Sequence, residues 1–253
     1  MSVNILGKEY DIATTTTLDL CYKSLTEIPE SIGSLYNLQE LHLHNNNLIS
    51  LSESIGSLSN LQKLYLDNNN LTELPKSIGS LSNLQELQLE YNNLTILPES
   101  IGSLSNLKYL SLSYNNLTSL PESIQSLSNL KYLSLEKNKL TSLWVDKKSE
   151  TFSIHDASES IGSLSNLQYL DLSYNKLTRL PKSIKTLIET NYFGLDESSY
   201  DINNLSMDCH TLVLTSIENN ITNLPPILRT LYLKSDINVD MIKIPYGCDI
   251  IRF

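Results

Sequence analysis

The chain has 253 residues and a net charge of −10, with 18 Lys and Arg against 28 Asp and Glu. This balance argues against a nucleic-acid partner, because proteins that bind nucleic acids carry basic stripes that displace counterions from phosphates. No apolar run approaches the roughly 18–20 residues that a membrane span needs. We therefore expect neither a nucleic-acid partner nor a membrane partner.

The start of the chain and its cysteines indicate an intracellular setting. Met1–Tyr10 lacks the basic segment followed by an apolar segment that marks a secretory signal. Cys21, Cys209 and Cys248 form no CxxC pair and no clusters at the two ends that could make disulfide caps. Free thiols are typical of reducing compartments. The sequence therefore predicts a cytoplasmic protein.

One sequence motif, LxxLxLxxNxL, recurs through most of the chain. Copies follow one another at intervals of 23 residues, and one more copy comes later than that interval. A fixed period of this length indicates a solenoid, in which each unit packs only on its neighbours. The copies begin at Leu38, Leu61, Leu84, Leu107, Leu130 and Leu167.

The first half of each unit has the pattern of a strand. In Lys63–Asp67, for example, apolar and polar residues alternate, which is the period-2 pattern of a strand with one buried face. Leu64 and Leu66 are expected to point inward and their polar neighbours outward. Stacked units would bring such strands together in a parallel sheet.

The second half of each unit predicts a turn and a short helical return. Asn69 falls where the chain leaves the strand, and its amide can donate to and accept from backbone groups that the turn leaves unpaired. Pro75 opens the return segment, and Ile78 and Leu81 have the spacing of a short helical or 3₁₀ stretch with one buried stripe. We expect a buried ladder of asparagines along the solenoid: Asn46, Asn69, Asn92, Asn115, Asn138 and Asn175.

The predicted fold is an α/β repeat solenoid. A strand on one side and a compact helical turn on the other differ in width, so the stack bends into a horseshoe with a concave parallel β-sheet and convex short helical or 3₁₀ segments. The strand pattern occurs about eleven times. These strands are expected to begin near Thr17, Glu40, Lys63, Glu86, Tyr109, Tyr132, Tyr169, Tyr192, Thr211, Thr230 and Ile250.

The two ends depart from the regular repeat, although residues 1–253 are predicted to form a single solenoid. Residues 1–14 are expected to cap the N-terminal end, and residues 15–187 carry the 23-residue repeats. Residues 188–253 contain shorter, degenerate repeats and a C-terminal cap. In our alignment of these repeats Leu228 matches Cys248 and Leu231 matches Ile251, which predicts that the thiols of Cys209 and Cys248 are buried in the core.

An insertion interrupts the regular repeats. Leu130 and Leu167 are 37 residues apart, which is one period plus the 14 residues of the segment 144–157. This segment contains Trp144 and Phe152. Either it is a neutral insertion whose aromatic side chains cover the adjacent convex turn, or it is a loop that contacts a partner.

These motifs resemble the leucine-rich repeat family. The consensus LPxSIGxLxNLxxLxLxxNxL is similar to that of intracellular Ras-group repeats, and the repeats that follow it cover about residues 15–187. The shorter repeats that follow look like the FNIP-type variant that is found in amoebae and their giant viruses. The resemblance implies a protein–protein interaction scaffold rather than a catalyst.

The repeats differ from one another chiefly at the outward strand positions of the concave face. Divergence on one face suggests a partner there, although relaxed constraint on an exposed surface would give the same pattern. Tyrosine is enriched at interfaces, and the excess of acidic residues complements a basic or arginine-containing surface. The predicted partner-binding residues are His42, His44, Tyr65, Glu86, Glu90, Tyr109, Tyr132, Glu136, Tyr169 and Asp171.

No motif in the sequence indicates catalysis or a cofactor. A phosphate-binding glycine loop, GxSxG and HExxH are absent from the sequence. His42 and His44, close to Glu40 and Asp67, have side chains that suit a metal such as zinc, but solvated histidines are the commoner arrangement, and we predict no metal site. The sequence predicts a non-catalytic scaffold, either a monomer or a weak homodimer paired through a sheet edge.

Two other functions remain open at this point. One is an adhesion or receptor-like recognition module on a cell or virion surface. The other is an adaptor that recruits substrates to a larger enzyme complex, such as a ubiquitin ligase or a phosphatase. Neither has a motif of its own in the sequence.

Overall fold

The computed structural model describes residues 1–141, 164–177, 192–195, 211–214, 217, 220–224, 226 and 228–252. The predicted insertion with Trp144 and Phe152 lies outside these residues, and so does Cys209. The division of residues 188–253 into shorter repeats also falls partly outside them and stays a prediction.

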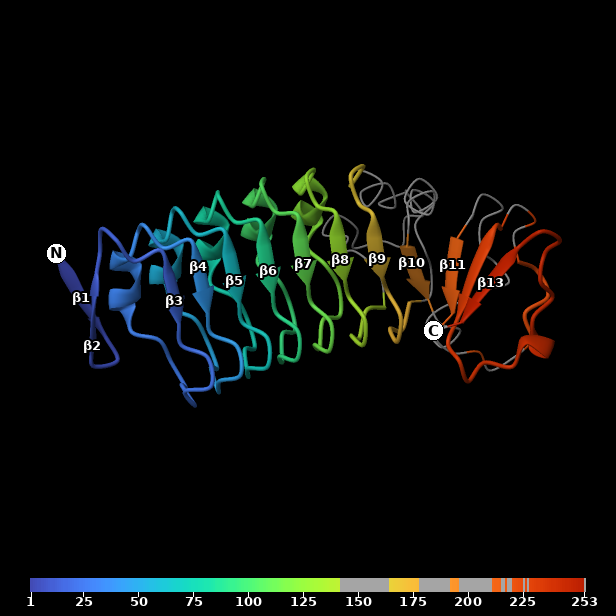
Figure 1. The fold of residues 1–253 in the computed structure, drawn as a ribbon, viewed down its shortest axis with the longest axis horizontal. Coiled ribbons are helices and arrows are strands. Elements are labelled where there is room, and N and C mark those ends of the chain that lie inside the picture. Colours follow the sequence, from blue (N-terminus) through green and yellow to red (C-terminus); the bar gives the residue numbers. More distant parts are fainter. Residues whose placement is uncertain are drawn as a thin grey trace, which may run out of the picture.

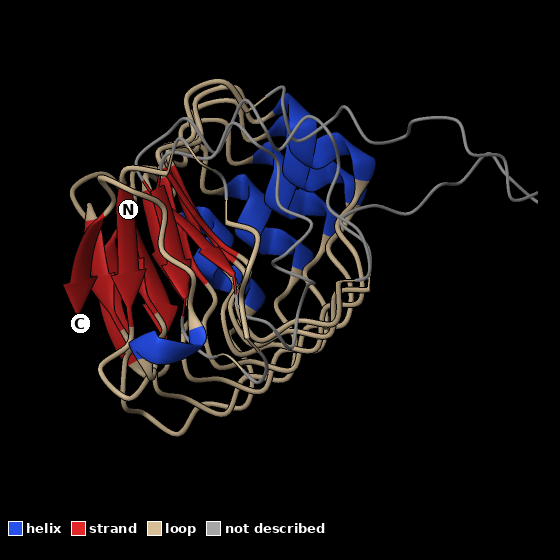
Figure 2. Ribbon diagram, turned by 90° about the vertical axis from the view of Figure 1, so that its right-hand side faces the viewer, coloured by secondary structure: helices blue, strands red, loops and turns tan. Residues whose placement is uncertain are grey.

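Within the described residues, eleven parallel strands form one sheet whose spatial order follows the chain (Figure 1). The stacked 3₁₀ helices of the regular repeats lie on the opposite side of the molecule from the sheet (Figure 2). This architecture confirms the predicted repeat solenoid. The strands are β3 (Thr17–Asp19), β4 (Glu40–His42), β5 (Lys63–Tyr65), β6 (Glu86–Gln88), β7 (Tyr109–Ser111), β8 (Tyr132–Ser134), β9 (Tyr169–Asp171), β10 (Tyr192–Leu195), β11 (Thr211–Leu214), β12 (Thr230–Leu233) and β13 (Asp249–Arg252).

The convex side carries one short 3₁₀ helix in each regular unit that is described there. Four of these helices follow a proline and one follows Ser52, whose hydroxyl accepts a hydrogen bond from Ser54 N. Proline suits this position because its fixed φ fits a helix start and the first N–H of a helix has no partner inside the helix. The helices are η1 (Glu30–Ser34), η2 (Glu53–Ser57), η3 (Lys76–Ser80), η4 (Glu99–Ser103) and η5 (Glu122–Ser126), and a sixth, η8 (Val239–Met241), lies near β12 and β13 in the chain.

An antiparallel hairpin covers the core at the β3 end of the sheet. It consists of β1 (Ser2–Ile5) and β2 (Lys8–Asp11), joined by a turn in which Gly7 has φ +81°. Ile5 is buried, and β1 packs against η1. The hairpin therefore shields the leucines of the first unit from water.

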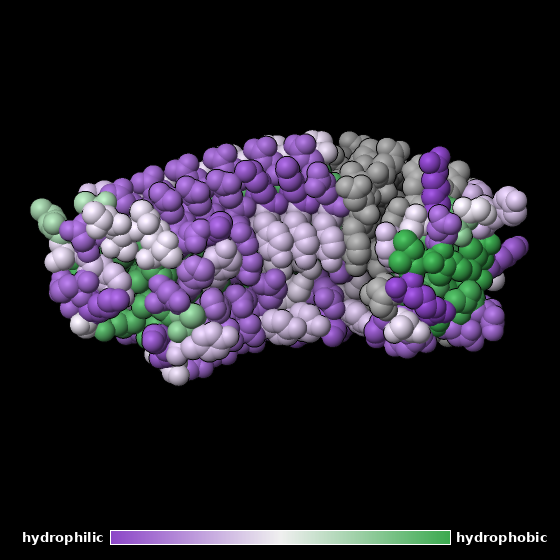
Figure 3. Space-filling view, viewed as in Figure 1, coloured by the Kyte–Doolittle hydropathy of each residue, from purple (hydrophilic) through white to green (hydrophobic). Residues whose placement is uncertain are grey.

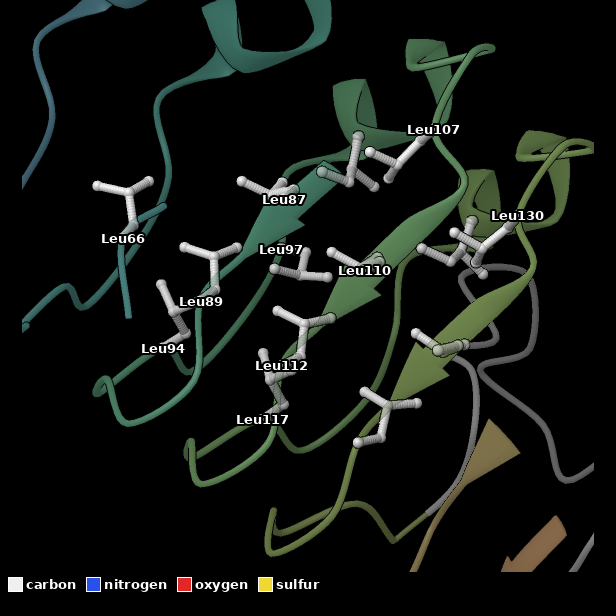
Figure 4. Close-up of a cluster of buried hydrophobic side chains, with 14 of the residues drawn as sticks. Leu66, Leu87, Leu89, Leu94, Leu97, Leu107, Leu110, Leu112, Leu117 and Leu130 are labelled. Carbon is white, nitrogen blue, oxygen red and sulfur yellow. The ribbon is translucent and has the colours of Figure 1, made fainter. Parts of the chain in front are cut away.

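The core is a set of leucine rows that run along the solenoid. Figure 4 shows Leu87 and Leu110 pointing from neighbouring strands into the same interior. Both are fully buried, as are the equivalent Leu64 and Leu133. Burial of one leucine side chain stabilises a fold by roughly 1.5–3 kcal/mol. Since each leucine is covered by leucines of the next unit, the units stabilise one another.

The six asparagines of the predicted ladder lie buried at the strand exits. The amide of Asn92 donates to the carbonyls of Leu66, Leu89 and Glu90 at 2.9–3.2 Å, and its oxygen accepts from Leu71 N at 3.0 Å. Leu66 and Leu71 belong to the preceding unit, so one side chain joins two units. The same pattern recurs at Asn46, Asn69, Asn115, Asn138 and Asn175.

The last strand differs from the prediction by one residue. Thr230 pairs with Asp249 and Leu231 pairs with Ile250, so the position equivalent to Leu231 is filled by Ile250 and not by Ile251. The strand begins one residue earlier than predicted, at Asp249, so the preceding turn, where Gly247 has φ +78°, is one residue shorter than the alignment implied. A shift of one residue moves each side chain of a strand to the other face.

The predicted burial of Cys248 is also wrong. Its side chain is only partly buried against the core. It precedes β13, which is the outermost strand of the described sheet and has Ile250 and Ile251 more than 40% exposed. The thiol therefore lacks the neighbouring unit that covers Leu228.

Replacement of Asn92 by alanine is expected to lower the free energy of unfolding by at least about 2 kcal/mol, because it leaves several buried backbone groups unpaired. Asn93→Ala is the matched control, since Asn93 is the next residue and its side chain is exposed. Urea unfolding followed by circular dichroism measures both. Equal stabilities of the two variants would contradict the structural role of the ladder.

The convex helices stack closely because glycine stands at the contact. A Cβ added to Gly56 would lie 2.7 Å from Ser77 O and 2.6 Å from Ser77 Cβ, closer than real Cβ atoms approach other atoms. Gly56→Ala is therefore expected to force the two units apart and to cost about 1–3 kcal/mol of stability. Ser57→Ala, at an exposed position of the same helix, should be neutral in thermal unfolding. A neutral Gly56→Ala variant would show that the stack adjusts without strain.

Candidate functional site

The tyrosine stack, which we define as Tyr109, Tyr132 and Tyr169, runs across β7, β8 and β9. The three residues pair in register. Equivalent residues of adjacent strands lie about 4.8 Å apart, a spacing that lets flat rings stack. The ring centroids are 4.1 and 4.2 Å apart and the rings are nearly parallel, at 7° and 10°. The sheet thus presents a continuous aromatic row, in which each ring limits the movement of the next.

Small buried side chains lie on the same strands as the tyrosine stack. Ser111 and Ser134 occupy outward strand positions of the repeat but are nearly inaccessible to solvent. Asp171 was expected to contact a partner, but it is only 6% exposed. Its carboxylate accepts hydrogen bonds from Tyr169 Oη at 3.3 Å and Ser173 N at 2.9 Å. Asp171 therefore positions the ring of Tyr169 instead of facing a partner directly.

The environment of Tyr109 keeps its hydroxyl neutral. Burial raises the pKa of Tyr109 well above its usual value of 10, and the neighbouring Tyr132 raises it further. Glu86 and Glu90 act in the same direction because their negative charges disfavour a phenolate. The stack therefore begins beside two carboxylates, with Tyr109 held in its neutral form.

The acidic side chains form contacts within this face. Glu86 accepts hydrogen bonds from Gln88 Nε2 at 2.7 Å and from Tyr65 Oη at 3.5 Å. Glu90 and Glu136 are half-buried. Burial and the nearby Glu86 raise the pKa of Tyr65. The predicted residues from Tyr65 to Glu136 thus lie on adjacent strands of one surface.

A histidine cluster lies closer to the N-terminal end of the same face. The ring of His42 stacks on Tyr65, with centroids 4.6 Å apart, and meets His44 edge to face at 6.0 Å. Glu40 pairs with Lys63 at 2.8 Å, and this hydrogen bond lowers the pKa of Glu40. Among the described residues, no group of three or more His, Cys, Asp or Glu side chains is arranged to hold a metal ion.

A second aromatic row lies at the strand exits, and its residues are not among the predicted partner-binding residues. We define the strand-exit row as Tyr91, Tyr114, Lys137 and Tyr174. Tyr91 and Tyr114 stack at 4.2 Å, and Lys137 Nζ lies 4.6 Å from the Tyr114 ring centroid and 5.1 Å from that of Tyr174. The repeat period itself could have revealed the row, because all four residues directly precede an asparagine of the ladder.

Surface polarity varies along the molecule. The regular units are mostly hydrophilic in the view of Figure 3, and apolar surface gathers toward β11–β13. Tyr246, Ile250 and Ile251 are exposed there. In the described part of the chain, no helix has both the length and the apolar character to cross a membrane.

Comparison with protein-family models gives a direct match to this repeat. The model described as leucine-rich repeat matches residues 13–71, 59–117 and 82–140, and a second model of the same description matches residues 166–187. The chain belongs to the leucine-rich repeat family. A search of curated proteins found no match. No model of the FNIP type is among these matches, so that interpretation of residues 188–253 stays a prediction.

Solved structures of other leucine-rich repeat proteins are similar to this one. A leucine-rich repeat protein of Leptospira interrogans is 32% identical, with a TM-score of 0.50 over 91% of this chain and 70% of its own. Internalin C2 of Listeria monocytogenes is 25% identical, with a TM-score of 0.63 over 79% of this chain and 80% of its own. The functional domain of InlJ from Listeria monocytogenes is 21% identical, with a TM-score of 0.61 over 95% of this chain but 54% of its own, and supports the fold alone.

Alkaline titration tests the packing of the tyrosine stack. Since the folded state favours neutral Tyr109, this residue contributes stability that is present below pH 10 and is lost as the pH rises above that value. Tyr109→Phe is expected to make the loss of stability above pH 10 less steep and to remove one late-titrating phenol from the absorbance at about 295 nm. Tyr246→Phe is the control, because that ring is fully exposed. Identical curves for the two variants would contradict the burial of Tyr109.

Proposed function

We propose that this protein is a non-catalytic interaction scaffold that binds a protein partner on the concave face, through the tyrosine stack. Leucine-rich repeat proteins generally mediate protein–protein interactions, which supports a binding role for this chain. The observation that carries the proposal is the aromatic row of three parallel rings, 4.1 and 4.2 Å apart, on a regular sheet.

A pre-stacked aromatic row suits recognition for an energetic reason. Tyrosine offers a large apolar area with a polar tip, and buried aromatic side chains supply much of the binding energy at interfaces. A side chain that is already held in place loses little conformational entropy when a partner binds. The stack therefore provides a rigid anchor.

The charges near the stack favour a basic partner. Glu86, Glu90 and Glu136 lie on the strands or strand exits of the same face, and the chain as a whole has a net charge of −10. A basic or arginine-containing surface would complement this potential and speed association. The proposal includes a cytoplasmic location, since the three cysteines form no disulfide framework in the sequence. It also includes a monomer or a weak homodimer paired through β13.

The two other functions weighed from the sequence would use the same face. A surface recognition module and a substrate-recruiting adaptor differ from the proposed scaffold in where the protein acts and in what the bound partner does. No observation on the described residues favours either over the scaffold.

Replacement of all three rings of the tyrosine stack by alanine is expected to weaken partner binding at least 100-fold, since central aromatic residues contribute about 2 kcal/mol or more each. A partner would first be captured with the wild-type chain from a lysate of the cells in which the protein naturally occurs. The purified partner would then be titrated into each variant by calorimetry. Tyr36→Ala is the control, because Tyr36 is half-exposed in the turn before β4.

Circular dichroism must show that the triple variant keeps its fold, which we expect because the leucine core and the asparagine ladder are unchanged. Full affinity of the folded triple variant for the purified partner would overturn the proposed use of this face.

A further inference from the structure

The strand-exit row departs from what its backbone prefers. Every residue at this repeat position has a positive φ of +51° to +56°, the left-handed region that most side chains avoid. Asparagine tolerates this region because its short amide can bond locally, whereas other residues adopt it at a conformational cost. Two units have asparagine there and the others have tyrosine or lysine: Tyr22, Asn45, Asn68, Tyr91, Tyr114, Lys137 and Tyr174.

This substitution pattern indicates that the tyrosines serve more than the turn. Asn45 and Asn68 show that asparagine makes the same turn in this chain with a lower backbone cost. Strained residues that persist are concentrated at functional sites. The rings of Tyr91 and Tyr114 are therefore retained at a conformational cost, which points to a contact outside the fold.

The position of Lys137 shows that the strand-exit row accommodates a cation between its aromatic rings. Lys137 Nζ lies between the rings of Tyr114 and Tyr174, at 4.6 and 5.1 Å from their centroids, and donates to Tyr114 Oη at 3.1 Å. Aromatic faces attract cations through their quadrupole. A positive charge of the chain itself thus occupies one position of the row.

The row has an open end at Tyr91. One face of this ring stacks on Tyr114. On the other side the equivalent position is Asn68, whose short amide turns away to donate to Asp67 Oδ2 at 2.9 Å. Asn68 N donates to Glu90 O at 2.8 Å, so the two units are directly adjacent here. Tyr91 is 50% exposed, and no ring or cation of the described residues stacks on its outer face.

We propose that the outer face of Tyr91 binds an arginine side chain of the protein partner, in the way that Lys137 occupies the gap between Tyr114 and Tyr174. Arginine fits better than lysine because a planar guanidinium stacks on a ring while its N–H groups pair with a carboxylate. Asp67 and Glu90 flank this position. The inference rests on the proposed function, since it names one contact of the same partner surface.

The chain offers a direct test, because a lysine can be placed where the arginine would bind. Asn68→Lys gives Tyr91 the neighbour that Tyr114 has in Lys137, and Lys137 shows that lysine is tolerated with this backbone. Asn45→Lys is the control for the same change of charge at the equivalent turn one unit further away, where the neighbouring ring, Tyr22, meets His44 edge to face at 5.7 Å and is not the end of a stacked row. Tyr91→Asn removes the ring and gives this position the asparagine that the two preceding units have.

The probe is a blocked, fluorescently labelled peptide of alternating glycine and arginine, compared with the same peptide containing citrulline, the neutral isostere of arginine. Fluorescence anisotropy at low salt should show that Asn68→Lys and Tyr91→Asn each weaken arginine-peptide binding about three- to fivefold, the range of an exposed cation–π contact. Asn45→Lys should bind like the wild type. The citrulline peptide should bind more weakly and should not distinguish the variants.

Two results would overturn the inference: equal wild-type affinities for the arginine and citrulline peptides, or undiminished arginine-peptide binding by Asn68→Lys and Tyr91→Asn. Thermal unfolding checks that each variant is folded. Binding measurements with the purified partner distinguish a failure of this inference from a failure of the proposed function. Loss of binding in the triple variant of the tyrosine stack, with full binding by Tyr91→Asn, would leave the scaffold function in place and remove only the contact at Tyr91.

Discussion

In-register parallel pairing is the constraint on which this structure depends. Each regular strand bonds to the same positions of the next unit, as when Tyr109 pairs with Tyr132 and Leu110 with Leu133. Every side chain therefore has its own counterpart as a neighbour, about 4.8 Å away. Leucines then make a core, asparagines make a hydrogen-bonded ladder and tyrosines make a stack. The repeated sequence is stable because each residue type packs well against itself.

The repeat period made most of the fold predictable, because it fixes which positions lie side by side. The strands from Thr17 to Thr230 begin where the pattern places them. The last strand was misplaced by one residue, since the turn at Gly247 is one residue shorter than the sequence alignment implied and Asp249 belongs to the strand. Burial on the sheet face was harder to predict. Alternation marks Asp171 as outward, but its carboxylate accepts a hydrogen bond from the hydroxyl of Tyr169 and the side chain is buried.

The strand-exit row was not among the predicted contacts, for a different physical reason. A left-handed turn is inferred from asparagine or glycine, so tyrosine at the same position gives no such signal. The repeat period places Tyr91 at the position of Asn68, but only the backbone angles show that this position is left-handed. Both aromatic rows begin near β6, after units rich in histidine, lysine and glutamate. The concave face thus has a charged part and an aromatic part, and a partner that spans them must satisfy both.

The pairing of β8 with β9 has a consequence for how this chain can change. Tyr132 and Tyr169 are 37 residues apart in sequence, yet their rings stack at 4.2 Å, as closely as rings from units of regular length. The pairing of β8 with β9 thus keeps its register despite the longer sequence between the two strands. The length of that sequence and the chemistry of the sheet face are therefore separate variables. Mutation can lengthen or shorten the insertion without altering the aromatic surface. It can equally substitute residues of that surface without altering the insertion.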